Sequence, residues 1–220
     1  MSYTAADFHI AKLGEFFSRL CNDDLEALKR LVADGADATN SESLRCLLEN
    51  NACKNCFQKL VWLVEECGAD VNLLDGRGRR PLMYACTVKI ARYLIEHGAD
   101  TAACNVEEGG KTVLMYLLEH LHGREKDKAA LFDLVLSKGA DVLTIDSKGK
   151  TALDVLRKNE RYFSPSVVAA FKAYAAKAEA KAAFYREQFG ENCRVALKSK
   201  AGHFLDLCAR VDLNGNKNAL

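Results

Sequence analysis

The chain has 220 residues, of which 49% are apolar and 28% charged, with a formal net charge of +1; this composition predicts a soluble, folded protein. The near-neutral charge argues against binding to nucleic acid or to a membrane surface, and no apolar run reaches the ~18–20 residues of a membrane span. Nine cysteines, an odd number, and an N-terminus unlike a signal peptide favour reduced thiols in a cytoplasmic protein.

The first predicted element is a helix over residues 5–20. Its apolar residues recur at helical spacing and run into Cys21, so one face is expected to be buried. The helix is therefore expected to cover the N-terminal end of whatever follows it.

Short apolar helices then recur, and each is followed by the triplet Gly-Ala-Asp. The triplets begin at Gly35, Gly68, Gly98 and Gly139, with separations of 33, 30 and 41 residues. A turn signal at this period is typical of stacked repeat units. The glycine can end the helix in a left-handed conformation, and the aspartate can accept hydrogen bonds from backbone amides in the turn.

A second signal lies between the triplets, where a glycine turn precedes the start of a new helix. It is clearest in Asp75–Ala85, where Pro81 occupies the first helical turn. Two weaker copies carry Thr112 and Thr151 at the position of an N-cap. The alternation of the two signals predicts units made of a turn and two helices.

These units resemble ankyrin repeats, which carry an Asp-x-x-Gly-x-Thr-Pro-Leu-His stretch, two antiparallel helices and Gly-Ala-Asp. The resemblance extends from about Cys21 to Leu156. It departs from the family pattern at Arg80, which replaces the threonine, and throughout Ser41–Asp70, which lacks the Thr-Pro-Leu signal. Other residues also replace the family's histidine, namely Met83, Met115 and Asp154. The resemblance implies an all-α ankyrin-repeat solenoid of about four and a half units with β-turn fingers.

Two units depart from the usual repeat length. The stretch from Gly78 to Gly98 is three residues short, which predicts a trimmed turn between its two helices. The stretch from Gly110 to Gly139 is about six residues longer than the usual repeat. The extra residues fall in the polar octet Leu121–Lys128, which is predicted to form an exposed loop.

Ser164 and Pro165 are a good N-cap and a good first residue, and they predict a long helix that ends near Phe189. Its first half is expected to serve as the second helix of a fifth unit. One or two short helices are expected within 195–211. The predicted domains are therefore a repeat stack with its N-terminal cap over 1–160, and a C-terminal helical extension over 161–220. The extension is basic, with 10 Lys and Arg against 5 Asp and Glu.

Candidate chemical sites in the sequence are weak. The pair Cys53 and Cys56 is half of a zinc site or a redox pair, but no second pair accompanies it, and packing in a helical turn is the favoured interpretation. A metal or nucleophile site at Cys193, His203 and Cys208 is disfavoured against a buried structural role. The glycine turns lack the spacing of a phosphate-binding loop. We therefore expect no catalytic residue, no metal, no cofactor and no enzymatic activity.

The finger turns carry a more informative signal, because they are basic in three units. Stacking of the units would align these side chains into a positive stripe, which is either a solvated surface or a binding site for an acidic or phosphorylated peptide. The resemblance implies partner binding on the concave face formed by finger tips and inner helices. The predicted partner-binding residues are Arg77, Arg79, Met83, Lys111, Met115, Lys148, Lys150 and Asp154.

The expected function is that of a non-catalytic protein-interaction module with an acidic protein partner. We expect it to be a monomer outside its complex and to bind neither nucleic acid nor membrane. The alternative is a structural subunit that is permanently embedded in a larger assembly, with Tyr185, Phe189 and Phe204 as its docking aromatics.

Overall fold

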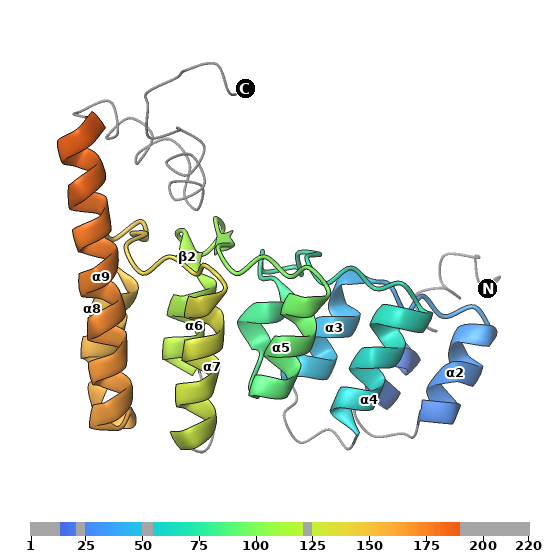
Figure 1. The fold of residues 1–220 in the computed structure, drawn as a ribbon. Helices are drawn as coiled ribbons and strands as arrows, with labels where there is room; N and C mark the ends of the chain where they lie inside the picture. The colour runs from blue at the N-terminus through green and yellow to red at the C-terminus, as the bar shows by residue number, and fades with distance from the viewer. Residues whose placement is uncertain (1–13, 21–24, 50–54, 121–124, 190–220) are drawn as a thin grey trace. The chain divides into compact units, whose positions relative to one another are not determined.

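The computed structural model describes residues 14–20, 25–49, 55–120 and 125–189 of the chain. It divides into two compact units, unit 1 (Met1–Asp100) and unit 2 (Thr101–Leu220). The described residues are mainly helical (Figure 1), which confirms the all-α expectation. None of the helices described is long and apolar enough to cross a membrane. The division into 1–160 and 161–220 stays a prediction.

Unit 1 is built from short helices. Residues 14–20 are helical, followed by α2 (Leu25–Ala33), α3 (Ser41–Glu49), α4 (Cys56–Val61), the π-helix η1 (Trp62–Glu66), the 3-10 helix η2 (Pro81–Tyr84) and α5 (Val88–Glu96). Helix α3 packs against α4 and η2, and η2 packs against α5.

The helix over residues 14–20 is anchored in unit 1, as a terminal cap requires. Phe16 and Leu20 are fully buried, and the buried Lys59 donates from Nζ to the carbonyl oxygen of Leu20 at 2.7 Å. A lysine is well suited to this position, because the last carbonyls of a helix lack intrahelical donors. The first part of the predicted helix, residues 5–13, lies outside the described residues.

The Gly-Ala-Asp triplets end helices as predicted. All four glycines have positive φ, between 75° and 96°. In three copies the alanine amide donates to the carbonyl five residues earlier, which is the hydrogen bond of a Schellman cap: Ala36 to Leu31, Ala99 to Leu94 and Ala140 to Val135. The triplet aspartate accepts a backbone amide bond in Asp37, Asp70 and Asp141, as the sequence also predicted.

The second triplet contains a feature that the sequence analysis missed. Leu94 and Ala91 lie four and seven residues before Gly98, whereas Leu63 and Leu60 lie five and eight residues before Gly68. The π-helix η1 absorbs this extra residue, because its hydrogen-bonded turn holds one residue more than an α-turn. Leu60 and Leu63 consequently stay fully buried.

Unit 2 begins with a two-stranded antiparallel hairpin, β1 (Cys104–Asn105) and β2 (Lys111–Thr112). It continues with α6 (Val113–His120), α7 (Glu125–Ser137), α8 (Ala152–Asn159), the 3-10 helix η3 (Glu160–Tyr162) and α9 (Pro165–Phe189). Helix α6 packs against α8, while α9 packs against both α7 and α8 (Figure 1). The long helix thus has its predicted bounds and pairs with α8, with Phe171 packed edge-on against Phe132 of α7.

Both predictions from unit length need correction. In unit 1 the missing residues shorten the first helix itself, since η2 has four residues where α6 and α8 have eight each. Thr87 caps α5 immediately afterwards, its Oγ1 accepting the amide of Ile90 at 3.2 Å, so the chain must leave η2 early. In unit 2 the predicted loop is shorter than expected, because α7 already begins at Glu125; residues 121–124 lie outside the described residues.

Candidate functional site: the finger loops

Each unit carries a loop that precedes a new helix, here called the unit 1 finger (residues 72–80) and the unit 2 finger (residues 143–151). A buried aspartate organises each loop. Oδ1 of Asp75 accepts the amides of Arg77 at 2.8 Å and Arg79 at 2.9 Å. Oδ1 of Asp146 accepts those of Lys148 and Lys150 at the same two distances. Carboxylates that accept two amides hold a turn firmly.

The backbone of the two fingers is also the same. The amide of Asp75 donates to Arg79 O at 3.0 Å, and the amide of Asp146 donates to Lys150 O at 2.9 Å. Gly78 and Gly149 both have φ of 70°, a conformation that disfavours any residue with a Cβ. The two loops are therefore equivalent frames that carry different side chains.

Each frame presents an aliphatic side chain directly before the aspartate and cations after it. Leu74 is 46% exposed and Ile145 is 61% exposed. Among the cations, Arg77, Lys148 and Lys150 are exposed and Arg79 is half-buried. The fingers thus combine apolar contact surface with positive charge.

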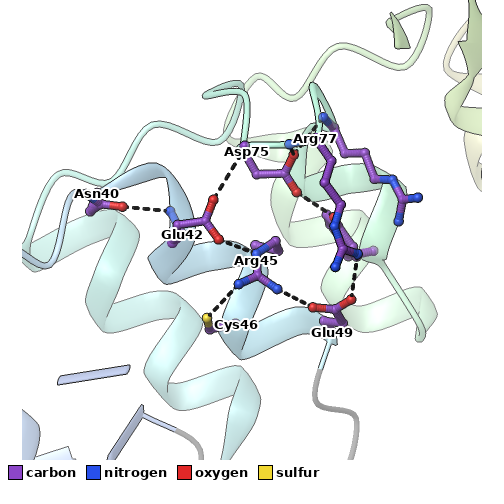
Figure 2. Close-up of polar contacts among 10 residues, drawn as sticks. Asn40, Glu42, Arg45, Cys46, Glu49, Asp75 and Arg77 are labelled. Carbon is purple, nitrogen blue, oxygen red and sulfur yellow. Dashed lines mark hydrogen bonds and ion pairs between the residues drawn. The ribbon is translucent and has the colours of Figure 1, made fainter. Parts of the chain in front are cut away.

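One cation of the unit 1 finger, Arg77, is held by helix α3 (Figure 2). Nη1 of Arg77 lies 3.3 Å from Oε1 of Glu49, which also pairs with Arg45. Arg45 in turn pairs with Glu42, whose Oε1 accepts the amide of Gly76 at 3.0 Å. Partial burial of Arg45 opposes its charge, but the bonds and charges of the two glutamates outweigh this and raise its pKa.

Tyr84 and Arg79 extend this network on the other side of the finger. The hydroxyl of Tyr84 donates to Oδ2 of Asp75. Burial is the largest cause of the raised pKa of Tyr84, and this hydrogen bond is the next. The guanidinium of Arg79 lies 5.8 Å from the centroid of the Tyr84 ring, within the range of a cation–π contact. The unit 1 finger is therefore a connected set of polar groups.

Two of the predicted partner-binding residues are not surface residues. Met83 in η2 is 3% exposed and Met115 in α6 is 0% exposed. Both side chains pack in the interior, so the expectation that they offer apolar contact to a partner is corrected.

The unit 2 finger is joined to the β1–β2 hairpin. The amide of Ser147 donates to the carbonyl of Gly109 at 2.7 Å, and a Cβ on Gly109 would lie 2.4 Å from Oγ of Ser147. The hairpin carries Val106, which is 81% exposed, beside Glu107 and Glu108. An acidic pair therefore lies next to the basic finger, and the positive stripe is not uniform within unit 2.

The remaining predicted residues in unit 2 differ in their surroundings. Nζ of Lys111 lies 2.6 Å from Oε2 of Glu119, and both side chains are mostly covered. Lys148 and Lys150, by contrast, form no ion pair with any residue that the structure describes. Of the predicted contact residues in unit 2, Lys148 and Lys150 are thus the cations presented to solvent.

Asp154 has a local structural role. Its Oδ2 accepts the amide of Thr151 at 3.0 Å and the Thr151 hydroxyl at 2.8 Å, forming a capping box at the start of α8. The bonds from the backbone and hydroxyl of Thr151 lower the pKa of Asp154. Thr112 also caps α6 as predicted, since its Oγ1 accepts the amide of Met115 at 3.3 Å.

Sequence analysis overlooked four residues of these surfaces: Glu49, Leu74, Val106 and Ile145. Leu74 and Ile145 share a recognisable position, directly before the finger aspartate, where an aliphatic residue on a turn is unexpected. Glu49 had no such signal, because its contact with Arg77 spans 28 residues of sequence.

The structure brings no metal-binding cluster together within the part of the chain it describes: no group of three or more His, Cys, Asp or Glu side chains is suitable. Cys56 opens α4 and its thiol lies 3.6 Å from the carbonyl oxygen of Leu47. Cys53, the other cysteine of this motif, lies outside the described residues, as do Cys193, His203 and Cys208.

Comparison with known families agrees with the helix pairs and fingers. A family model described as ankyrin repeats (3 copies) matches residues 18–103 and 46–146. No curated protein matches the chain.

Proposed function

Since this chain belongs to the ankyrin repeat family, whose repeats are generally protein–protein interaction modules and typically non-catalytic, we propose that it is a non-catalytic module that binds an acidic segment of a protein partner. The observation that carries the proposal is the pair of equivalent fingers, which hold arginine or lysine side chains outward on rigid loops. Pre-formed loops spare binding the cost of ordering their backbone, so that only the arginine and lysine side chains lose freedom when they bind a carboxylate.

The proposed contact residues are not equivalent. Arg77, Lys148 and Lys150 are exposed and form its centre, with Arg79 beside them. Lys111 and Asp154 are engaged by Glu119 and Thr151, so their contribution to binding is expected to be smaller. Because its contacts are fingers and not a permanent interface, the protein is expected to be a cytoplasmic monomer outside its complex.

The second candidate is a structural subunit embedded in a larger assembly. Exposed aromatic side chains on unit 2, Tyr162 at 55% and Phe184 at 50%, favour it, since large exposed aromatics are common in interfaces. An embedded subunit would be insoluble or aggregated when expressed alone, whereas an interaction module would be a soluble monomer.

Affinity capture with the purified full chain tests the proposal. Arg77→Glu with Arg79→Glu should weaken capture of partners that the wild type retains at low salt and releases at high salt. The matched control is Lys158→Glu with Lys177→Glu, which makes the same charge change on exposed sites away from the fingers. Equal capture by both double variants would remove Arg77 and Arg79 of the unit 1 finger from the binding site.

A further inference from the structure

We propose that the unit 2 finger is the primary contact and takes an aliphatic side chain flanked by carboxylates, whereas Glu49 keeps the equivalent unit 1 finger occupied by an internal ion pair. This inference rests on the proposed function and adds the chemistry of the partner and the order in which the fingers engage.

The unit 2 surface exposes two aliphatic side chains. Ile145 is 61% exposed on a loop that Asp146 holds rigid, and Val106 is 81% exposed on the adjoining hairpin. The bond from the Ser147 amide to Gly109 fixes hairpin and finger together. Ile145 and Val106 thus each present aliphatic surface on loops held by hydrogen bonds, so an apolar side chain can cover this surface without reorganisation of the backbone.

The unit 2 finger also carries positive charge. Lys148 and Lys150 are exposed on the same loop as Ile145, within five residues of it. Acidic side chains next to an aliphatic one would meet these lysines while the aliphatic group covers Ile145. A basic segment would be repelled by the lysines, and a purely polar one would leave Ile145 in water. The hairpin adds two carboxylates to this surface: Glu108 accepts the hydroxyl of Tyr116, and Glu107 is exposed beside Val106. Acidic side chains of a partner are therefore favoured over the finger lysines and not over the hairpin. Charge complementarity at the finger selects an acidic, aliphatic protein segment.

In unit 1, Glu49 competes with a partner carboxylate for Arg77. The Arg77–Glu49 pair has both side chains about half-exposed, so a partner carboxylate can replace Glu49. Exposed ion pairs of this kind contribute little, and displacing one lowers affinity by up to about fivefold. The unit 1 finger is therefore the weaker of the two for the same chemistry.

A random peptide library displayed on phage, selected against the immobilised full chain, tests the inference. We expect the enriched peptides to place leucine, isoleucine or valine beside aspartate or glutamate. A synthetic copy of one such peptide, measured by fluorescence anisotropy, should bind Ile145→Ser and the double variant Lys148→Glu, Lys150→Glu about tenfold more weakly than the wild type. These substitutions lie on exposed side chains, and circular dichroism checks that each variant is folded.

Two matched variants complete the experiment. Lys177→Glu alters an exposed lysine of α9 and should leave peptide affinity unchanged. Glu49→Gln removes the competitor of Arg77. Added to the double variant Lys148→Glu, Lys150→Glu, it should raise the residual affinity for the acidic peptide by about twofold to fivefold, because that residual binding takes place at the unit 1 finger.

The outcomes separate this inference from the proposed function. Enrichment of no peptide at all would contradict the proposed function and the inference with it. Enriched peptides without acidic residues, or with unchanged affinity for the unit 2 variants, would overturn the inference alone. Tighter binding of a single-stranded oligonucleotide than of any enriched peptide, lost in the double lysine variant, would assign the lysines to nucleic acid instead.

Discussion

The unit 1 and unit 2 fingers have the same hydrogen-bonded backbone, yet their surroundings differ. In unit 1, helix α3 supplies Glu42 and Glu49, which bind the loop backbone and Arg77. In unit 2, neither Lys148 nor Lys150 forms an ion pair among the residues described, although the charge of Lys150 helps to lower the pKa of Asp154. The loop is joined instead to a hairpin that carries Glu107 and Glu108. The frame is thus set by the repeat itself, and the chemistry on it by neighbouring elements.

The helices that follow the two fingers differ in the same way. Thr151 and Asp154 form a capping box, and the eight-residue α8 follows. The equivalent positions in unit 1 hold Arg80 and Met83, which supply no side-chain cap, and only the four-residue η2 forms. The missing side-chain cap at Arg80 and the shorter stretch before α5 therefore both limit how much helix follows the unit 1 finger.

The largest expected effect comes from removing the finger aspartates. Asp146→Ala leaves two amides without their acceptor and should lower the free energy of unfolding by about 2 kcal/mol. Asp75→Ala also leaves the Tyr84 hydroxyl without its acceptor and should lower it by about 3 kcal/mol. Urea unfolding followed by the fluorescence of Trp62, the single tryptophan, reports unit 1, and circular dichroism reports both units. Asparagine at either position keeps one acceptor and should recover part of the loss. Equal losses from the two alanine variants would contradict the role of Tyr84.

The next effect tests whether the two backbones are truly equivalent. Gly78→Ala and Gly149→Ala each place a Cβ on a residue with φ of 70° and should each cost about 1–2 kcal/mol. The same urea measurements apply. A loss in one finger only would break the comparison, since it would mean that one loop can relax out of the left-handed conformation.

Thr151→Ala should cost about 1 kcal/mol, because the amide of Asp154 loses the hydroxyl that accepts it. Thr151→Ser keeps that hydroxyl and serves as the control. Circular dichroism at the helical minimum gives both stabilities. A Ser variant as unstable as the Ala variant would assign the effect to the threonine methyl group instead of the cap.

The smallest effects concern pH, and they have opposite signs in the two units. The raised pKa of Tyr84 means that its bond to Asp75 stabilises unit 1 fully below the unfolded-state pKa of about 10 and is lost as pH rises through the higher folded value. The lowered pKa of Asp154 means that its contribution is present above the unfolded-state pKa of about 3.9 and is lost as pH falls through the lower folded value.

The stability differences between wild type and Tyr84→Phe, and between wild type and Asp154→Asn, measure these two contributions. The first should shrink only in alkaline solution and the second only in acid. Parallel profiles across the whole pH range would show that neither group titrates differently in the folded and unfolded chain.

Much of this fold was predictable from sequence because its signals are local. A glycine at the end of an apolar stripe needs no distant partner to adopt positive φ, and Ser164 with Pro165 marked the start of α9 by capping chemistry alone. The candidate site was only partly predictable. The position of each finger cation followed from the repeat, but the Arg77–Glu49 pair depends on long-range packing. The burial of Met83 likewise depends on how the short η2 packs, which no periodicity over four residues can indicate.

The π-turn in η1 bears on how such a chain can change length over evolutionary time. An added residue in an α-helix rotates everything beyond it by about 100° and would carry the leucines of that face away from their neighbours. Here the π-helix η1 accommodates the additional residue, and Leu60, Leu63 and the alanine of the triplet stay buried. A solenoid with this capacity tolerates single-residue insertions inside a helix, and its repeats can diverge in length while each unit remains stackable.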